Sequence, residues 1–363
     1  MPDARNVRAF GLHLRNLVER PHVEVATDNR PQNALEAADE LLIDISADLN
    51  PPSDRHQLLL AFHFGEASTE QAHPAVISTD LSTVGQDFVY ERWWYAGQVT
   101  YRSLGRVNVG ACDQYTVACF KGAEGEAEDF ERFVYGAYNE LLHIVRDCQH
   151  RRIVKIWNYL GGINEGSDDN ERYRQFSVGR ARAFEDAGIL DDHAPTGTAI
   201  GTILDAGLTI VALATNSKFK LVENPRQISA FNYPRQYGLK SPKFCRGGQV
   251  SADNHTLYLI SGTAAIVGHE STHPYDVQLQ IGETVRNLKS LCEALSQHAS
   301  DGATLILDNA SVLRVYLRNA EDVELVAATL RETLLLDSQR VVYLQGNICR
   351  RELVVEIDGV RIC

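Results

Sequence analysis

The chain has 363 residues, of which 44% are hydrophobic and 23% are charged, and its formal net charge is -13 at pH 7. This composition is typical of a folded globular protein of about two domains. The acidic balance argues against nucleic acid as a partner, because no net-basic domain is available to neutralise phosphates. The first residues lack the apolar region of a signal peptide, and the longest apolar stretch, 202–215, is interrupted by Asp205 and too short to cross a membrane. The seven cysteines are odd in number and form no CxxC pair, which favours a reducing, cytoplasmic setting.

The first half of the chain predicts strands around one clear helix. Short alternating runs broken at Gly105 and Gly110 are typical of antiparallel strands. Residues 127–149 place apolar side chains on one helical face. The expected elements are, in order, a short amphipathic helix at 33–46, a buried strand at 57–64, antiparallel strands within 88–120, the helix at 127–149, a strand at 153–160, and a strand at 208–215 with 219–222 as its hairpin partner.

The second half repeats the order of a hairpin, a helix, a strand, a helix and two strands. Its expected elements are a strand at 256–267, a helix at 276–298, a strand at 311–317, a helix at 320–335 with Asn319 as N-cap, and a closing hairpin of 341–344 and 352–357. An internal duplication is the simplest account of this order. We therefore expect an α+β fold of two modules, each a mixed sheet with helices packed on one face. The predicted domains are 1–222, which includes an N-terminal extension, and 223–363.

A basic island stands out on this acidic chain. It contains four arginines within eleven residues: Arg172, Arg174, Arg180 and Arg182. Such a run is often the solvated face of an exposed amphipathic helix. Here it follows an aromatic strand, IVKIWNYL, that ends in a Gly-Gly turn, and loops that follow strand ends commonly bind anions. Because arginine binds carboxylates in a forked, bidentate way, a carboxylate site is the second interpretation.

The last part of the chain resembles the RidA-like (YjgF-like) family of enamine/imine deaminases. The matching segments are YLISGTAAI, DVQLQIGETVRNLKSLCEAL, VLRVYLRNAEDVELV and ELVVEIDGV. In that family an acidic residue of the closing strand lies in the active-site cleft, and Glu356 matches it. The family's carboxylate-binding arginine is missing, because Val341, Val342 and Tyr343 stand at that place. The resemblance therefore disfavours simple enamine deamination.

The chain from about residue 86 onward is more specifically similar to the chorismatase family. Five motifs agree in order: IWNYLGGIN, ERYRQFSVGRARAF, ENPRQISAFNYPRQYG, ISGTAAIVGHESTH and CRRELVVEIDG. Chorismatases remove pyruvate from chorismate and have a RidA-like core. The resemblance thus implies two RidA/YjgF-like modules and a chorismate-cleaving enzyme that needs no metal or organic cofactor.

Three positions are candidates for catalysis. Glu356 shares a strand face with Val354, so we expect a buried carboxyl with a raised pKa that serves as a general acid, although an edge-strand glutamate facing water is the alternative. Without the resemblance, Cys349 would be interpreted as a buried structural cysteine and Gly262 as a bulge or packing glycine. In chorismatases, positions that match Gly262 and Cys349 separate product types, and this pair resembles the branch that forms 3-hydroxybenzoate.

Chorismate, the substrate that the resemblance implies, is a dianion, so binding it requires a pocket with cationic side chains. The segment YPRQY at 233–237 could be a surface turn, but the matching family segment lines the substrate pocket. The residues that we expect to bind substrate are Tyr159, Arg172, Arg180, Tyr233, Arg235 and Thr263.

Several alternatives stay open. The segment 269–273 spells HExxH, but a glycine before it and a proline after it favour a hairpin loop over the helix that a zinc protease needs. A hydrolytic chorismatase that yields a dihydroxycyclohexadiene carboxylate and a non-catalytic RidA-like ligand-binding protein are the other functional interpretations. RidA-like modules often form trimers, whereas a fused pair need not, so both a monomer and a trimer are expected possibilities.

Overall fold

Three sheets and four helices carry the architecture of the computed structural model, which describes residues 40–66, 73–125, 129–297, 304–334, 336 and 338–363. All of these residues fall within one compact unit. The most N-terminal sheet has four strands, in the order β1 (Leu41–Ser46), β5 (Phe88–Ala96), β2 (His56–Gly65) and β3 (Val76–Ser78).

The two larger sheets have the same topology. The first runs in the order β6 (Thr100–Leu104), β7 (Val107–Ala111), β8 (Tyr115–Gly122), β11 (Leu208–Thr215), β9 (Arg152–Gly161), β10 (Thr196–Thr202) and β19 (Asn347–Ile348). The second runs in the order β12 (Lys218–Val222), β13 (Gly247–Ser251), β14 (Thr256–Ala264), β20 (Val355–Ile362), β17 (Ser311–Leu317), β18 (Val341–Gln345) and β4 (Ser82–Thr83). In both sheets only the fifth and sixth strands are parallel. This correspondence is the internal duplication that the order of elements predicted.

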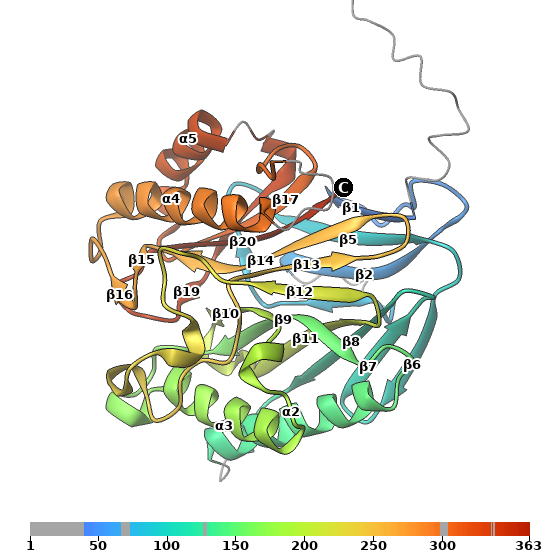
Figure 1. Ribbon diagram of the computed structural model, residues 1–363, viewed down its shortest axis with the longest axis horizontal. Coiled ribbons are helices and arrows are strands. Elements are labelled where there is room, and N and C mark those ends of the chain that lie inside the picture. Colours follow the sequence, from blue (N-terminus) through green and yellow to red (C-terminus); the bar gives the residue numbers. More distant parts are fainter. Residues whose placement is uncertain (1–39, 67–72, 126–128, 298–303, 335, 337) are drawn as a thin grey trace, which may run out of the picture. The chain divides into compact units, whose positions relative to one another are not determined.

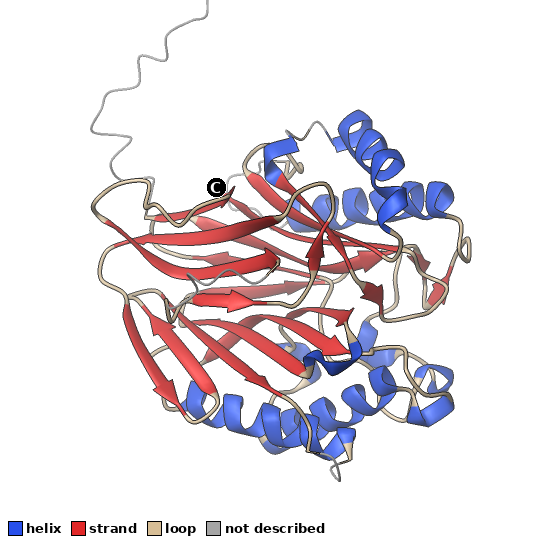
Figure 2. Cartoon of the chain, turned by 180° about the vertical axis from the view of Figure 1, so that it is seen from behind, coloured by secondary structure: helices blue, strands red, loops and turns tan. Residues whose placement is uncertain are grey.

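The four helices cover the outer faces of the two larger sheets. They are α2 (Phe130–Arg146), α3 (Arg172–Asp186), α4 (Val277–Ser296) and α5 (Val323–Leu334). In Figure 1, α2 and α3 lie on one side of the paired sheets, and α4 and α5 lie on the other. Figure 2 shows the strands enclosed between these helical layers. The predicted α+β architecture, with helices on one face of each sheet, is therefore confirmed.

The helix that was clearest in the sequence forms as expected. Asp129 caps α2 by accepting a hydrogen bond from the backbone N–H of Glu131 at 2.9 Å. Its buried face consists of Phe130, Phe133, Val134, Ala137, Tyr138, Leu141, Leu142 and Val145. The neighbouring helix α3 crosses it closely at Gly179, where a Cβ would lie 2.5 Å from the carbonyl oxygen of Glu131. Gly179, which lies within the Arg-rich stretch, thus allows the two helices to pack closely.

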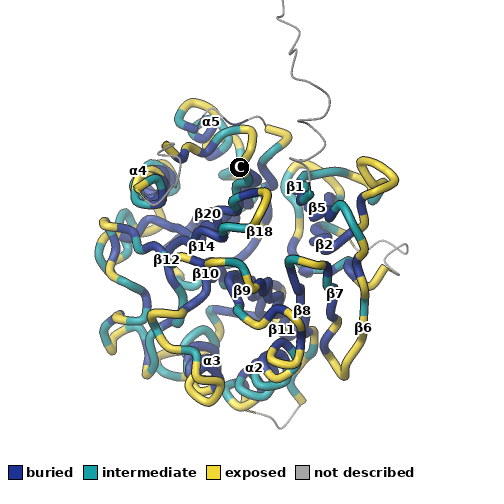
Figure 3. Tube along the Cα trace, turned by 45° about the vertical axis from the view of Figure 1, so that its right-hand side comes forward, coloured by how far each residue is buried: buried dark blue, intermediate teal, exposed yellow. Residues whose placement is uncertain are grey.

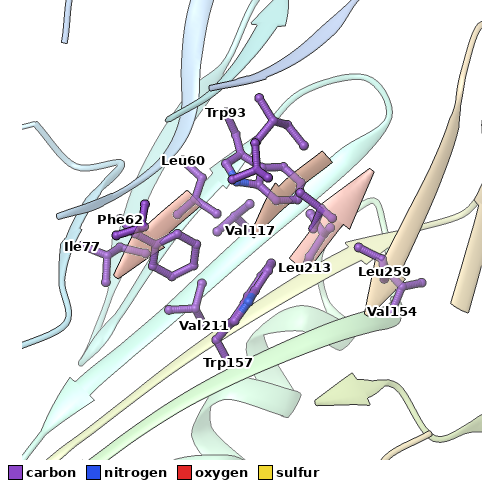
Figure 4. Close-up of a cluster of buried hydrophobic side chains, with 14 of the residues drawn as sticks. Leu60, Phe62, Ile77, Trp93, Val117, Val154, Trp157, Val211, Leu213 and Leu259 are labelled. Carbon is purple, nitrogen blue, oxygen red and sulfur yellow. The ribbon is translucent and has the colours of Figure 1, made fainter. Parts of the chain in front are cut away.

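The main hydrophobic core lies between the three sheets. Figure 4 shows its centre, where Phe62 and Trp93 of the N-terminal sheet meet Trp157 and Leu213 of the first large sheet and Leu259 of the second. The ring of Trp157 meets the rings of Phe62 and Trp93 edge to face, with 5.1 and 5.9 Å between the ring centroids. Figure 3 shows that the strands are mostly buried, whereas exposed residues gather on turns and outer helix faces. Burial of this apolar surface holds the sheets together.

A fully buried ion network crosses this core. Arg314 of β17 donates from Nε and Nη2 to both carboxylate oxygens of Glu91 on β5, at 2.7 and 2.6 Å. Its Nη1 lies 3.3 Å from Oδ2 of Asp358 on β20. Lys155 of β9 lies on the other side of Asp358, with 3.3 Å between Nζ and Oδ2. The network therefore joins all three sheets through two cations and two anions.

Three sequence-based assignments are wrong. Leu41–Ser46 is a strand paired with β5 and not part of a helix, because Leu41 and Ile43 alternate into the core; residues 33–39 of that predicted helix lie outside the described residues. Lys218–Val222 is not the hairpin partner of β11 but pairs with β13 in the second large sheet. The closing strands β18 and β20 do not form a hairpin, because β17 lies between them.

Smaller differences occur at helix ends. Asn319 precedes a short 3₁₀ turn, Ala320–Asp322, and its side chain donates to the Asp322 carboxylate at 3.1 Å instead of capping the helix. The ends of the predicted helices at 127–128, 298 and 335 lie outside the described residues. Within the described part of the chain, no helix combines the length and apolarity that crossing a membrane requires.

The buried ion network yields a stability prediction. Glu91→Gln leaves the Arg314 guanidinium buried without its bidentate anion, so we expect a loss of about 3–5 kcal/mol in the free energy of unfolding. Glu131→Gln is the matched control, because Glu131 pairs with Arg182 near the surface and should cost less than about 1 kcal/mol. Urea unfolding of both variants measures the difference, and equal losses would contradict a structural role for the network.

Candidate active site

A cavity of about 600 Å³ opens where the two large sheets meet. The sheets touch at β10 and β14, where the backbone N–H of Gly197 donates to Oγ of Ser261 at 2.9 Å. The cavity walls come from both modules: the start of α3, β10, the loop at 233–246, the end of β14 and the segment at 349–352. Its volume is within the range of pockets for small organic ligands.

Glu356 forms part of the cavity wall and confirms the expectation of a buried carboxyl. The residue is 5% exposed and follows the first residue of β20. Burial raises its pKa to about 8, and the negative charge of Asp358 two residues along the strand adds to this rise, while Lys155 and Arg246 oppose it. At neutral pH the carboxyl is therefore protonated and able to donate its proton.

Gly262 lies directly against the carboxyl of Glu356. It belongs to an irregularity of β14, where the pairing with β20 shifts between Ile260 and Thr263. A Cβ at Gly262 would overlap Oε1 of Glu356 and lie 2.9 Å from its Cδ. The space that a side chain at this position would occupy is filled by the Glu356 carboxyl. A larger residue at this position would displace the carboxyl.

Cys349 lies in the loop after β19 and also lines the cavity. Burial raises the pKa of its thiol to about 12, and the charge of Glu356 contributes. The thiol is therefore neutral, and it presents a small, weakly polar surface to the cavity. Tyr173 from the start of α3 lies nearby, and burial raises the pKa of its phenol well above the usual value.

Two deeply buried arginines supply positive charge. Arg180 of α3 is 3% exposed and stacks on Phe176, and its Nε and Nη2 have no hydrogen-bond partner within the described residues. Arg246, also 3% exposed, donates to the Tyr233 hydroxyl at 2.6 Å and to a backbone carbonyl, and its Nε is unpartnered in the same part of the chain. Buried donors without partners are rare in proteins, so these groups are candidates for binding an anion.

The outer part of the cavity is also rich in charge. The guanidinium carbon of Arg350 lies 3.9 Å from the centroid of the Tyr237 ring, and the guanidinium donates to the Ser271 hydroxyl at 3.0 Å. Arg174 forms an ion pair with Glu171 at 3.2 Å. The remaining charged groups in the lining are Asp168, Arg351 and Glu352. This region can orient a charged ligand, but much of its charge is already compensated.

The structure brings together five of the nine predicted site residues. Lining the cavity are Gly262, Cys349, Glu356, Arg180 and Tyr233. The other four are not among its lining residues, and the structure does not support their assignment to the substrate site.

Each of these four has another environment. Tyr159 packs in the core with its ring 6.3 Å from Phe62. Arg172 pairs with Glu124 at 2.6 Å and stacks on a phenylalanine. Arg235 forms a surface ion pair with Asp169, and the hydroxyl of Thr263 donates to the backbone within its own strand. Arginines close in sequence point to different sides of a helix, which explains why the basic island divides between the cavity and the surface.

Sequence reasoning missed several lining residues. Arg350 and Arg351 stand in the motif CRRELVVEIDG, where only the cysteine and the glutamate were selected. Arg246 has no such signal beyond the two glycines that follow it. Its role becomes visible only when the loop at 233–246 folds over the end of β14.

The HExxH segment is a hairpin loop, as its flanking residues predicted. β15 (Ile266–Val267) pairs with β16 (Glu270–Ser271), so the two histidines do not share a helical face. Among the described residues, no group of three or more His, Cys, Asp or Glu side chains is arranged to hold a metal ion.

Comparisons with known proteins show similarity to chorismatases. The family model described as "Chorismatase FkbO/Hyg5-like, N-terminal" matches residues 91–214. A protein of Streptomyces hygroscopicus named 3-hydroxybenzoate synthase is 33% identical over 243 residues, which are 62% of this chain and 67% of that protein. A chorismatase of Streptomyces rapamycinicus is 34% identical over 230 residues, which are 61% of this chain and 68% of that protein. A crystal structure of a chorismatase superposes with a TM-score of 0.76 at 26% identity, covering 88% of this chain and 97% of that one.

The buried arginines yield a binding prediction. Arg180→Met and Arg246→Met should each weaken the binding of isophthalate, a small aromatic dicarboxylate, by about 2–5 kcal/mol, because each removes a desolvated cation from the cavity. Arg235→Met is the control and should leave the dissociation constant unchanged, since its guanidinium pairs with Asp169 at the surface. Isothermal titration calorimetry measures all three, and unchanged affinity in the first two variants would show that the anion binds elsewhere.

Proposed function

The chain belongs to the chorismatase family, and we propose that it converts chorismate into 3-hydroxybenzoate and pyruvate. The observation that carries this proposal is the neutral, buried carboxyl of Glu356 in a cavity with two buried arginines. The similarity to a protein named 3-hydroxybenzoate synthase supports this product over the hydrolysed one.

The proposed substrate fits the charge of the cavity. Chorismate is a dianion in which a vinyl ether links a cyclohexadiene ring to a pyruvate-like carboxylate. Arg180 and Arg246 offer buried N–H donors to its two carboxylates, and Tyr233 holds Arg246 in place. A bound ligand would thus satisfy donors that have no partner in the described chain.

Glu356 starts the reaction as a general acid. It protonates the terminal carbon of the vinyl ether, which creates an oxocarbenium ion, and such proton transfer contributes about 10²–10⁴-fold to the rate. The ring's own hydroxyl oxygen then attacks the neighbouring ring carbon that carries the ether, so the bond from that carbon to the pyruvate oxygen breaks as the new carbon–oxygen bond forms, and loss of the hydroxyl proton leaves an epoxide. The epoxide opens at the carbon that first carried the hydroxyl, its oxygen is reprotonated, and loss of a ring proton gives the phenol. Pyruvate leaves as the keto acid.

The reaction consumes no water and requires none in the cavity. The neutral thiol of Cys349 offers only a weak hydrogen bond, so it does not hold a nucleophilic water near the cation. As the ring becomes aromatic it releases a proton, and the Glu356 carboxylate takes up a proton to restore the acid. The atoms of chorismate therefore suffice for both products.

The wider setting of the protein rests on the same reasoning. The six cysteines from Cys112 to Cys349 form no disulfide, which supports the proposed reducing, cytoplasmic location. The matching topology of the two large sheets supports a division into two domains just before β12, near residue 217 and a few residues earlier than the predicted boundary after residue 222, because β12 belongs to the second large sheet.

The function is tested by incubating the purified protein with chorismate and identifying both products by mass and ultraviolet spectrum. We expect pyruvate and 3-hydroxybenzoate in equal amounts. A dihydroxycyclohexadiene carboxylate, which is not aromatic, would establish hydrolysis instead. Binding of chorismate without release of pyruvate would refute an enzymatic role.

The acid role of Glu356 predicts the behaviour of Glu356→Gln. The amide has the same size but cannot donate a proton in this way, so kcat should fall by about 10²-fold or more. In the wild type, kcat/KM should decrease as the pH rises through about 8, because the protonated carboxyl is lost. The residual rate of the variant should lack this decrease. Retention of more than about a tenth of the wild-type rate would contradict the acid role.

Product choice provides a further prediction. Gly262→Ala moves the Glu356 carboxyl, and Cys349→Ala removes the thiol that fills the cavity wall. The double variant should shift the product from 3-hydroxybenzoate toward the hydrolysed diene diol, with Glu356 still supplying the proton. Reaction in ¹⁸O-labelled water, followed by mass spectrometry, shows whether solvent oxygen enters the product. Exclusive formation of 3-hydroxybenzoate by the double variant would show that these two positions do not control the outcome.

A further inference from the structure

A buried charge pair lies immediately behind the acid. Asp358 is on β20 two residues after Glu356, and Lys155 reaches it from β9 in the other large sheet. Neither side chain is exposed, and neither lines the cavity. Their charges can therefore act on Glu356, but their side chains do not contact a molecule bound in the cavity.

Lys155 is tied to three parts of the site. Its Nζ donates to the Ile260 carbonyl at 2.7 Å and to the Thr198 hydroxyl at 3.1 Å, and it lies 3.3 Å from Asp358. Ile260 begins the irregularity of β14 that presents Gly262 to Glu356. The lysine thus holds the backbone against which the acid packs.

Asp358 is held as a carboxylate by its surroundings. Its Oδ2 accepts a hydrogen bond from Thr198 at 2.6 Å and faces Arg314, and its Oδ1 accepts one from Tyr316 at 3.2 Å. Burial alone would raise its pKa, but the charges of Lys155 and Arg314 outweigh this effect and lower it.

The balance of charges explains the state of Glu356. Burial lowers the pKa of Lys155 to about 8, so this lysine is mostly charged at neutral pH. Lys155 and Arg314 then match Asp358 and Glu91, and the buried network is neutral without a contribution from Glu356. An ionised Glu356 would add an uncompensated negative charge next to Asp358, which is costly in a buried position. The other polar groups that face Glu356 are Arg246, Cys349 and Tyr173.

We propose that Asp358 and Lys155 are positioning residues that set the protonation of Glu356 from behind the cavity, with opposite effects. This inference deepens the proposed function, since it concerns the same acid. Asp358 favours the neutral, proton-donating form. Lys155 limits that preference, so the carboxylate left after proton transfer is stabilised, and it fixes the strand that carries Gly262.

The test follows the protonation of Glu356 without substrate. Infrared difference spectra between each protein and its Glu356→Gln counterpart report the protonated carboxyl over a pH series. Asp358→Asn should move the midpoint to lower pH by about one unit or more, because it removes a neighbouring negative charge. Lys155→Met should move the midpoint upward by a similar amount. Asp308→Asn is the matched control. Asp308 pairs at 3.1 Å with Arg361, which is on the same strand as Glu356 but does not line the cavity, so this substitution should cause no shift.

Each variant is an independent arm, so one folded variant is enough to decide. Opposite shifts with an unmoved control support the inference. No shift in a folded variant, shifts of the same sign, or an equal shift in the control would overturn it. The proposed function is judged separately by the release of pyruvate from chorismate. Absence of release together with opposite shifts refutes the function and leaves the inference intact. Release of pyruvate without any shift supports the function and overturns the inference.

Discussion

The structure depends on the ion network that runs from Glu91 through Arg314 and Asp358 to Lys155. Each of these groups comes from a different strand, and together they join the N-terminal sheet and both large sheets. Buried ions are tolerated only when they are paired and hydrogen-bonded, so the network constrains how the three sheets can pack. Asp358 of this network is two residues from Glu356 on β20, so the packing of the three sheets also fixes the place of Glu356 in the cavity wall.

The duplicated topology makes a cavity at the seam between modules but leaves its chemistry in one of them. β11 and β20 occupy equivalent places in their sheets. β20 carries Glu356 and Asp358, whereas β11, with the sequence LTIVALAT, has no ionisable side chain. The first module instead contributes cations, Arg180 from α3 and Lys155 from β9. The buried carboxyls of Glu356 and Asp358 thus come from one module, and the other module adds buried cations beside them.

The close contact of Gly262 with Glu356 links the size of the residue at position 262 to the position of the Glu356 carboxyl. A side chain at position 262 cannot be accommodated while the carboxyl keeps its place. The residue at position 262 therefore determines where the Glu356 carboxyl can lie. Cys349, another residue of the lining, adds a neutral and weakly hydrogen-bonding surface.

Local patterns in the sequence were enough for the α+β class, the repeated order of elements, most strands and the helices, because amphipathic periodicity reflects burial against a sheet. Strand alternation favoured a buried side chain for Glu356, whereas Gly262 and Cys349 were singled out only by the resemblance to chorismatases. Strand partners were beyond such reasoning: β12 and β18 looked like hairpin strands but pair elsewhere, since sheet register is decided by contacts between distant segments. The same reason applies to the cations. Arg172 and Arg180 are two helical turns apart, yet only the second reaches the cavity, while Arg246 and Lys155 arrive from other elements. Sequence by itself determined which groups could do the chemistry, and only the tertiary structure decided which of them meet, because burial and neighbouring charge set the proton affinity of Glu356.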